Sequence, residues 1–135
     1  MANWFTNYEA IFGPKEEIKS LYEKLIEWSK PVRDELPDIR DIVEKAGIDP
    51  EKFYCRGSIT ESFAVKDYDE NNAVITFESE TAWGTIDLTW NELLKKYAPH
   101  CNYYYVSYGG YGVDSLSAYD PLGIFVVDVA AYVAW

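Results

Sequence analysis

The fold is decided by the stretch NWFTNYEAIFGPKEEIKSLYEKLIEW, which covers residues 3–28 of the 135-residue chain. Its first ten residues alternate between the two sides of an extended chain. One side carries the apolar positions Trp4, Tyr8, Ala10 and Phe12. The other side carries Asn7 and Glu9, so the pattern predicts a strand with one buried face.

A helix follows this strand directly. Gly13-Pro14 supplies the turn, because proline suits the first position of a helix, and Glu16 and Glu17 favour its positive N-terminus. The apolar residues then recur at helical spacing, as Ile18, Leu21, Tyr22, Leu25 and Trp28. This stripe predicts an amphipathic helix that ends near Ser29.

Residues 30–53 have the pattern of a helical insertion. Pro31 ends the first helix, Pro37 opens a second one, and Gly47 is placed to end it. Residues 54–66 and 73–79 then alternate around a polar turn, which predicts a β-hairpin.

The rest of the chain predicts one helix and three strands. Thr89 and Glu92 have capping-box spacing, so we expect a helix over residues 90–98. The expected strands are residues 102–108, 113–119 and 124–133, joined by the glycine-rich turn at 109–112 and by the turn at 120–123.

The element order βαββαβ is that of the ferredoxin-like split βαβ sandwich, an α+β fold with two helices on one face of an antiparallel sheet. We expect a single domain over residues 1–135, with the helical insertion at about 30–53 and extra C-terminal antiparallel strands. The expected core between sheet and helices is Trp4, Phe12, Leu21, Leu25, Phe77, Trp90 and Leu94.

Several short motifs carry a family resemblance. They are the opening Met1-x-Asn3-Trp4 with Asn7, the Gly13-Pro14 junction, and Thr81-Ala82-Trp83 after the hairpin. With these motifs the chain resembles the YubB-type ferredoxin-like domain family, over nearly its whole length. The resemblance implies a ferredoxin-like fold and a small protein of plasmids, phages or genomic islands, in a family whose members mostly have no assigned activity.

The charge balance restricts the class of partner. The chain has 12 basic and 23 acidic residues, a net charge of −11, and nothing basic follows Lys96. This charge disfavours direct binding to nucleic acids and to anionic membranes, since both require positive charge. An acidic surface can instead imitate a nucleic-acid backbone in the basic groove of a protein, although acidic residues also simply keep proteins soluble.

The leading hypothesis is therefore a non-enzymatic module that binds a protein with a basic surface, such as an anti-CRISPR or other anti-defence inhibitor. Acidic side chains and exposed aromatic rings would make the contact, because tyrosine and tryptophan dominate interface hot spots. The candidate partner-binding residues are Asp67, Asp69, Glu70, Glu78, Glu80, Trp83, Tyr104, Tyr108 and Tyr111. Tyrosine as ordinary strand filler is the alternative.

Two further hypotheses stay open. One is a small enzyme or nucleotide-binding protein that uses Glu61 and Asp128; Glu61 shares its parity with core residues unless a β-bulge turns it outward. The other is a structural homodimer through edge strands.

We expect no cofactor, no metal and no catalytic residue. Cys55 and Cys101 fit buried, reduced thiols, and in an extended chain the adjacent His100 and Cys101 point apart. The sequence shows no signal-peptide pattern, and its longest apolar stretch is too short to span a bilayer, so we expect a cytoplasmic protein.

Overall fold

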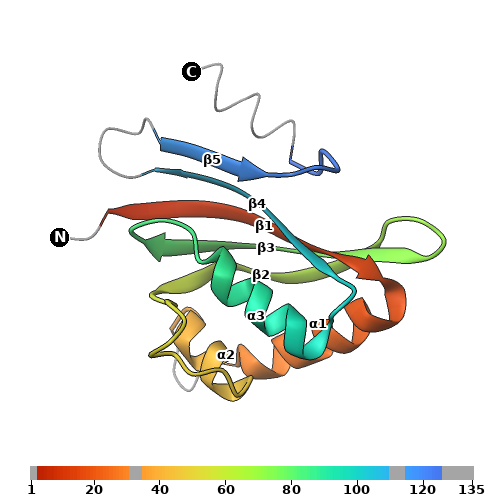
Figure 1. Cartoon of the computed structure of the whole chain (residues 1–135), viewed down its shortest axis with the longest axis horizontal. Coiled ribbons are helices and arrows are strands. Elements are labelled where there is room, and N and C mark those ends of the chain that lie inside the picture. The colour runs from red at the N-terminus through yellow and green to blue at the C-terminus, as the bar shows by residue number, and fades with distance from the viewer. Residues whose placement is uncertain (1–2, 31–34, 110–114, 126–135) are drawn as a thin grey trace.

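The computed structural model describes residues 3–30, 35–109 and 115–125 (Figure 1). The described elements are, in chain order, β1 (Trp4–Pro14), α1 (Lys15–Trp28), α2 (Ile39–Lys45), β2 (Gly57–Asp67), β3 (Asn72–Ala82), α3 (Asp87–Tyr97), β4 (Asn102–Gly109) and β5 (Ser115–Tyr119). The five strands form one antiparallel sheet in the order β2-β3-β1-β4-β5. The predicted α+β class is confirmed.

Strand β1 is central in the sheet, between β3 and β4. Its predicted strand conformation is confirmed, but the predicted orientation of its faces is wrong. Asn7, Glu9 and Ile11 are buried on the face that the helices cover, whereas Ala10 and Phe12 lie on the other face. The apolar alternation did not identify the helix side, because a central strand can be covered on both faces.

The main core fills the space between the sheet and the three helices. The predicted core residues Leu21, Leu25, Phe77, Trp90 and Leu94 all belong to it. The two other predicted members are misplaced. Trp4 is 47% exposed at the start of β1, and Phe12 packs in a small second cluster on the opposite face of the sheet.

The predicted second helix of the insertion is present as α2, whereas Pro31 lies outside the described residues. Asp38 caps α2 by accepting a hydrogen bond from the backbone N–H of Arg40 at 2.9 Å. Gly47 follows the helix with φ of +77°, the left-handed conformation that favours glycine after a helix.

Helix α3 begins three residues before its predicted start. The expected capping box at Thr89 is wrong, because Thr89 lies inside the helix and its hydroxyl donates to the carbonyl oxygen of Tyr54. This hydrogen bond ties α3 to the segment that leads into β2.

The β2–β3 hairpin is present; β2 begins three residues later and ends one residue later than predicted, and β3 extends beyond its predicted range at both ends. The register shifts on both sides of Glu61, where β2 bulges, and the Glu61 side chain is exposed. Of the two readings of Glu61, the bulge is the one that the structure confirms.

Strands β4 and β5 match two of the three predicted C-terminal strands. The predicted start of the third strand, over residues 124–133, is wrong, because Ile124 and Phe125 lie in a turn. The rest of that predicted strand lies outside the described residues. The Asp120 carboxylate accepts hydrogen bonds from the backbone N–H groups of Ile124 and Phe125, at 2.8 and 2.7 Å, and these bonds stabilise the turn. Phe125 packs there against the second, smaller core cluster.

Candidate functional site

The predicted acidic residues fall into two groups. Asp67, Asp69 and Glu70 are exposed at the β2–β3 hairpin tip, at the right of Figure 1. The Asp69 carboxylate accepts hydrogen bonds from Asn71 and Asn72 across the turn, and these bonds lower its pKa. Asp69 therefore shapes the turn, in addition to contributing negative charge.

Glu78 and Glu80 form the second group, on β3. They alternate on the face of the sheet away from the helices, opposite Tyr8 and Thr6 of β1. Glu80 is exposed and Glu78 is half-buried. This face of the sheet, which also carries the smaller core cluster, therefore presents carboxylates beside an aromatic ring.

The predicted tyrosines are not equally accessible. Tyr104 is only 7% exposed, because it packs against Phe12 and Tyr119. Tyr108 is half-buried, with its hydroxyl 3.0 Å from the hydroxyl of Tyr8. Tyr111 lies outside the described residues.

The end of the sheet where β1 begins and β3 ends, at the left of Figure 1, carries three exposed aromatic side chains. They are Trp4, Tyr54 and Trp83, with exposed fractions of 47%, 46% and 58%. We call Trp4, Tyr54, Arg56 and Trp83 the aromatic end.

All four residues of the aromatic end surround Ala82, the last residue of β3. Trp4 pairs with Ala82 across the sheet, the Tyr54 hydroxyl donates to the Ala82 carbonyl at 2.9 Å, and the Ala82 N–H donates to the Arg56 carbonyl at 3.1 Å. The Arg56 guanidinium lies 5.6 Å from the centre of the Trp4 ring. Sequence analysis singled out only Trp83 of this group as a binding residue.

Trp83 has an uncommon backbone conformation. Its φ is +69°, and within the described ranges no other residue except glycine has a positive φ. The Trp83 N–H donates to the carbonyl of Asn3 at 2.6 Å, which holds the turn in place. A bulky residue costs about 1 to 2 kcal/mol in this conformation.

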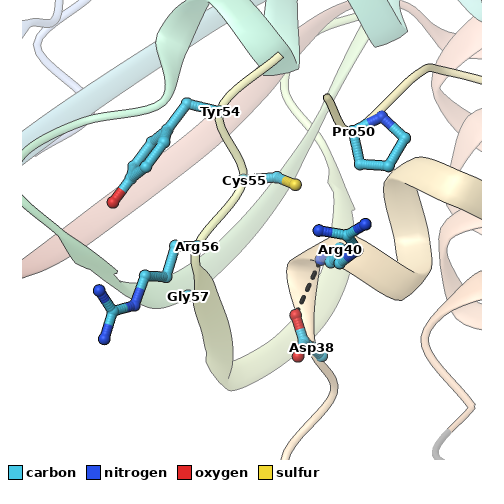
Figure 2. A pocket seen from close by; sticks show the side chains of 7 residues that line it. All are labelled: Asp38, Arg40, Pro50, Tyr54, Cys55, Arg56 and Gly57. Carbon is cyan, nitrogen blue, oxygen red and sulfur yellow. Dashed lines mark hydrogen bonds between the residues drawn. The ribbon is translucent and has the colours of Figure 1, made fainter. Parts of the chain in front are cut away.

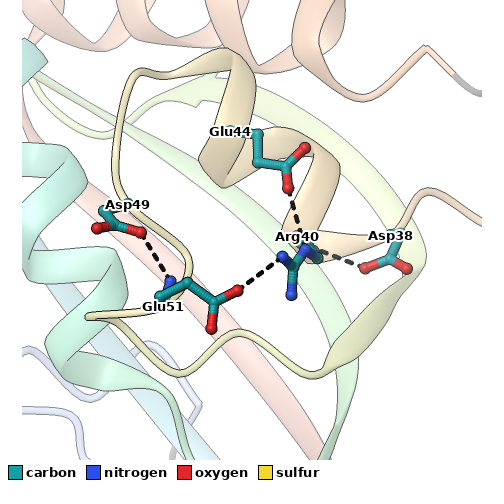
Figure 3. A network of polar contacts seen from close by, with 5 residues as sticks. All are labelled: Asp38, Arg40, Glu44, Asp49 and Glu51. Atoms are coloured by element: carbon teal, nitrogen blue, oxygen red, sulfur yellow. Dashed lines mark hydrogen bonds and ion pairs between the residues drawn. The ribbon is translucent and has the colours of Figure 1, made fainter.

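A pocket of about 290 Å³ borders the aromatic end (Figure 2). Figure 2 shows Tyr54 and Arg56 on one side of their segment and the Cys55 thiol on the other, toward Arg40. Arg40 is already paired with Glu44 and Glu51, at 3.0 Å each (Figure 3). These hydrogen-bonded ion pairs raise the pKa of Arg40, and the two carboxylates compensate the charge of its guanidinium, so Arg40 offers little net attraction to an anion.

The two cysteines are buried and form no disulfide, as predicted. Burial raises the pKa of Cys55, and it raises the pKa of Cys101 to about 12. His100 Nδ1 lies 2.8 Å from a carboxylate oxygen of Glu17, on the protein surface. Both thiols are therefore held in the protonated form, which is a poor nucleophile.

Sequence analysis missed a buried polar network beneath the helices. Glu9 is 0% exposed; its carboxylate accepts hydrogen bonds from Tyr103 at 2.7 Å and from Ser79 at 2.8 Å. Asn7 extends the network to Ser79 and Thr81. A glutamate and an asparagine within an otherwise apolar central strand were the signal that could have revealed it.

Burial raises the pKa of Glu9 to about 8, against the opposing effect of its hydrogen bonds. The nearby Trp90 indole N–H also lowers the pKa of Glu9, because it favours the ionised form. It makes no hydrogen bond of ordinary geometry to the described residues. Glu9 is therefore mainly protonated at pH 7, and Tyr103 connects it to a second cavity between α3 and the sheet.

The residues of the enzyme hypothesis are not seen to converge: Glu61 is exposed on its bulge, and Asp128 lies outside the described residues. Within the described ranges, histidine, cysteine and acidic side chains form no group of three suited to a metal ion. None of the helices described has the length and apolar composition that a membrane crossing requires.

Comparison with protein-family models, with curated protein sequences and with solved structures finds no match to this chain.

Proposed function

We propose that the chain is a non-enzymatic, acidic protein-binding module that contacts a basic partner through its aromatic end. The observation that carries this proposal is the grouping of Trp4, Tyr54 and Trp83 around the end of β3, each about half exposed. Large aromatic rings that stand in solvent supply the anchors of protein interfaces. Trp83 holds this position despite an unfavourable backbone conformation.

The charge of the chain supports a basic partner. With a net charge of −11, the protein attracts cationic surfaces and repels anionic ones. Glu80 lies two residues before Ala82 on the face of the sheet away from the helices, so acidic charge borders the aromatic anchors directly. The buried aromatic rings would then slow dissociation of the complex, and the carboxylates would speed association with the basic partner.

The specific form of the proposal is an inhibitor of a host nucleic-acid-binding machine, encoded by a mobile element and acting in the cytoplasm. An anti-CRISPR or other anti-defence protein that occupies a basic groove fits this description. The YubB-type resemblance belongs to the same proposal, as does an elaborated ferredoxin-like sandwich. The latter is supported by β1 lying between β3 and β4, with α1 and α3 on one face.

The Trp83→Gly variant tests the anchor. A host protein captured at low salt on the immobilised chain is purified, and its binding kinetics are measured by surface plasmon resonance. We expect Trp83→Gly to speed dissociation about 30-fold, as the loss of roughly 2 kcal/mol at a hot spot requires. Because glycine tolerates positive φ, the variant should unfold no more easily than wild type.

Leu122→Ala is the matched control, since Leu122 is an exposed apolar side chain in the turn after β5. It should leave the kinetics unchanged. Unchanged dissociation in Trp83→Gly, or a partner that duplex DNA does not displace, would contradict the proposal. Self-association that Trp83→Gly abolishes would instead favour the homodimer.

A charge reversal tests the acidic contribution. Replacing Glu78 and Glu80 together with lysine should slow association about tenfold at low salt and less at high salt, because charges at the rim of an interface act on encounter. Reversal of Glu16 and Glu23, two exposed acids on α1, changes the net charge equally and is the control. Equal slowing in both double variants would mean that the overall charge, and not the position of Glu78 and Glu80 on β3, steers the partner.

A further inference from the structure

We propose that the groove between α3 and strands β4 and β5 binds a lysine or arginine side chain of the basic partner. The inference rests on the proposed function for the source of that side chain, but it concerns a different surface. The groove has a volume of about 510 Å³. It is lined by Asp87, Asn91, Asn102, Tyr103, Tyr105, Ala118 and Tyr119.

The groove is formed where the helix layer ends. α3 contributes Asp87 and Asn91, one turn apart and therefore on the same side of the helix. β5 lies at the edge of the sheet, on the side away from α2 in Figure 1. The strip of β4 and β5 beside α3 is consequently the floor of an open groove of the size of a small-ligand pocket.

The charge of the groove selects a cation. Among the described residues that line the groove, Asp87 is the only charged one, and the Thr85 hydroxyl, 3.0 Å from the Asp87 carboxylate, holds that group in place. None of these described lining residues is a lysine or an arginine. An anionic ligand would meet a carboxylate with no compensating positive group, whereas an ammonium or guanidinium group would be attracted.

The aromatic lining also suits a cation. Tyr103 and Tyr105 stack with ring centres 5.6 Å apart, and Tyr119 on the neighbouring strand is 55% exposed. Tyrosine faces attract organic cations, and they also cover the methylene groups of a lysine or arginine side chain. Asn91 and Asn102 add amide oxygens that can accept the N–H groups of the cation.

Tyr103 is also fixed from behind. Its hydroxyl hydrogen-bonds to the buried Glu9 carboxyl group at 2.7 Å, so the side chain cannot change its χ1 rotamer without breaking a buried hydrogen bond. Tyr103 is itself only 4% exposed and stacks with both Trp90 and Tyr105. It therefore supports the more accessible Tyr105 ring and preorganises it for a cation, which reduces the entropy lost on binding.

The test uses small probes and the full-length protein labelled with ¹⁵N. Three probes are titrated separately: Nα-acetyl-lysine methylamide, Nα-acetyl-arginine methylamide and Nα-acetyl-norleucine methylamide. Changes in the backbone amide chemical shifts of the protein are followed by NMR. The two cationic probes should bind with dissociation constants in roughly the millimolar range. Their shifts should map to α3, β4 and β5, and the neutral norleucine probe should bind about tenfold more weakly.

Two variants make the assignment specific. Asp87→Asn keeps the shape and removes the charge, and Tyr119→Leu keeps apolar bulk and removes the ring; each should weaken cationic binding about five- to tenfold. Glu70→Gln changes the net charge equally at the distant hairpin tip and should have no effect. The amide spectrum of each variant reports whether the fold is kept.

Equal binding of the norleucine probe, or unchanged binding in both groove variants, would overturn the groove assignment. That outcome differs from failure of the proposed function, which is read from Trp83→Gly and a captured protein. If the probes bind as expected and partner binding is also weakened by Asp87→Asn, the groove is part of the partner interface. If the probes bind and partner binding is unchanged in Asp87→Asn, the assignment to a partner side chain is overturned.

Discussion

Relative to a Glu9→Gln variant, the wild-type protein is expected to lose on the order of 4 kcal/mol of unfolding free energy between about pH 4.5 and pH 8. The sign follows from proton counts. In this interval the unfolded chain has released the Glu9 proton, while the folded protein retains it. The folded state therefore binds more protons, and raising the pH favours unfolding. The stabilisation is complete below about pH 4.5 and is lost as the pH rises through about 8.

Glutamine is the suitable replacement because it imitates the neutral carboxylic acid. One carboxylate oxygen of Glu9 faces the Tyr103 hydroxyl and the other faces the Ser79 hydroxyl. An amide can accept from one hydroxyl and donate to the other, since hydroxyl groups do both. The variant should therefore keep the network while it removes the titration.

Urea unfolding of both proteins at pH 5, 7 and 9 measures this difference. Glu61→Gln, which removes an exposed carboxylate from the same sheet, is the matched control. Curves of wild type and Glu9→Gln that stay parallel over this range would show that Glu9 is ionised in the folded protein, and the burial argument would then be wrong.

Glu9 also shows what could and could not be predicted in the central strand. The alternation from Trp4 to Phe12 correctly predicted an extended strand. It could not predict which face the helices cover, because an apolar side chain can be buried on either face. The polar residues of β1 face the helices, where the hydroxyl groups of Ser79 on β3 and Tyr103 on β4 form hydrogen bonds with Glu9. Those hydrogen-bond partners lie about 70 and 94 residues away in sequence and form no local pattern.

Local signals located the helices and failed only where a tertiary contact competed. The Pro14 and Pro37 positions, and Gly47 after α2, gave helix bounds close to those observed. Thr89 had the spacing of a helix cap, but its hydroxyl bonds to Tyr54 and the helix begins one turn earlier. A capping residue and a buried side-chain anchor have the same sequence signature.

The candidate site was predictable only in part. Tyr103 and Tyr105 lie on the helix side of β4 and Tyr104 on the other side, as alternation along the predicted strand requires. Trp83 follows a strand directly, and its exposure matches the expectation of an accessible ring. Trp4 was assigned to the core because it shares the apolar parity of β1, but that parity belongs to the face away from the helices, and Trp4 at the strand end is 47% exposed there. Alternation separates the two sides of a strand, but it does not show which side the helix layer covers.

The second large effect is expected in the core, where Leu25→Ala should lower the free energy of unfolding by about 2 to 5 kcal/mol. Leu25 is 0% exposed on α1, in the cluster that joins all three helices to the sheet. Truncation removes buried apolar surface and leaves a cavity, since α1 is held by neighbours on several sides and cannot collapse into the space.

Leu36→Ala is the matched control, because it is the same chemical change at a side chain that is 59% exposed. Its effect on unfolding should stay within about 0.5 kcal/mol. Urea unfolding at one pH, with equal slopes for both variants, gives the comparison. A loss below about 1 kcal/mol in Leu25→Ala would mean that α1 does not pack on the sheet as described, because a well-packed leucine cannot be truncated so cheaply. The burial of Glu9 depends on the same helix layer, so the pH dependence of wild type should weaken in any variant that loosens this layer.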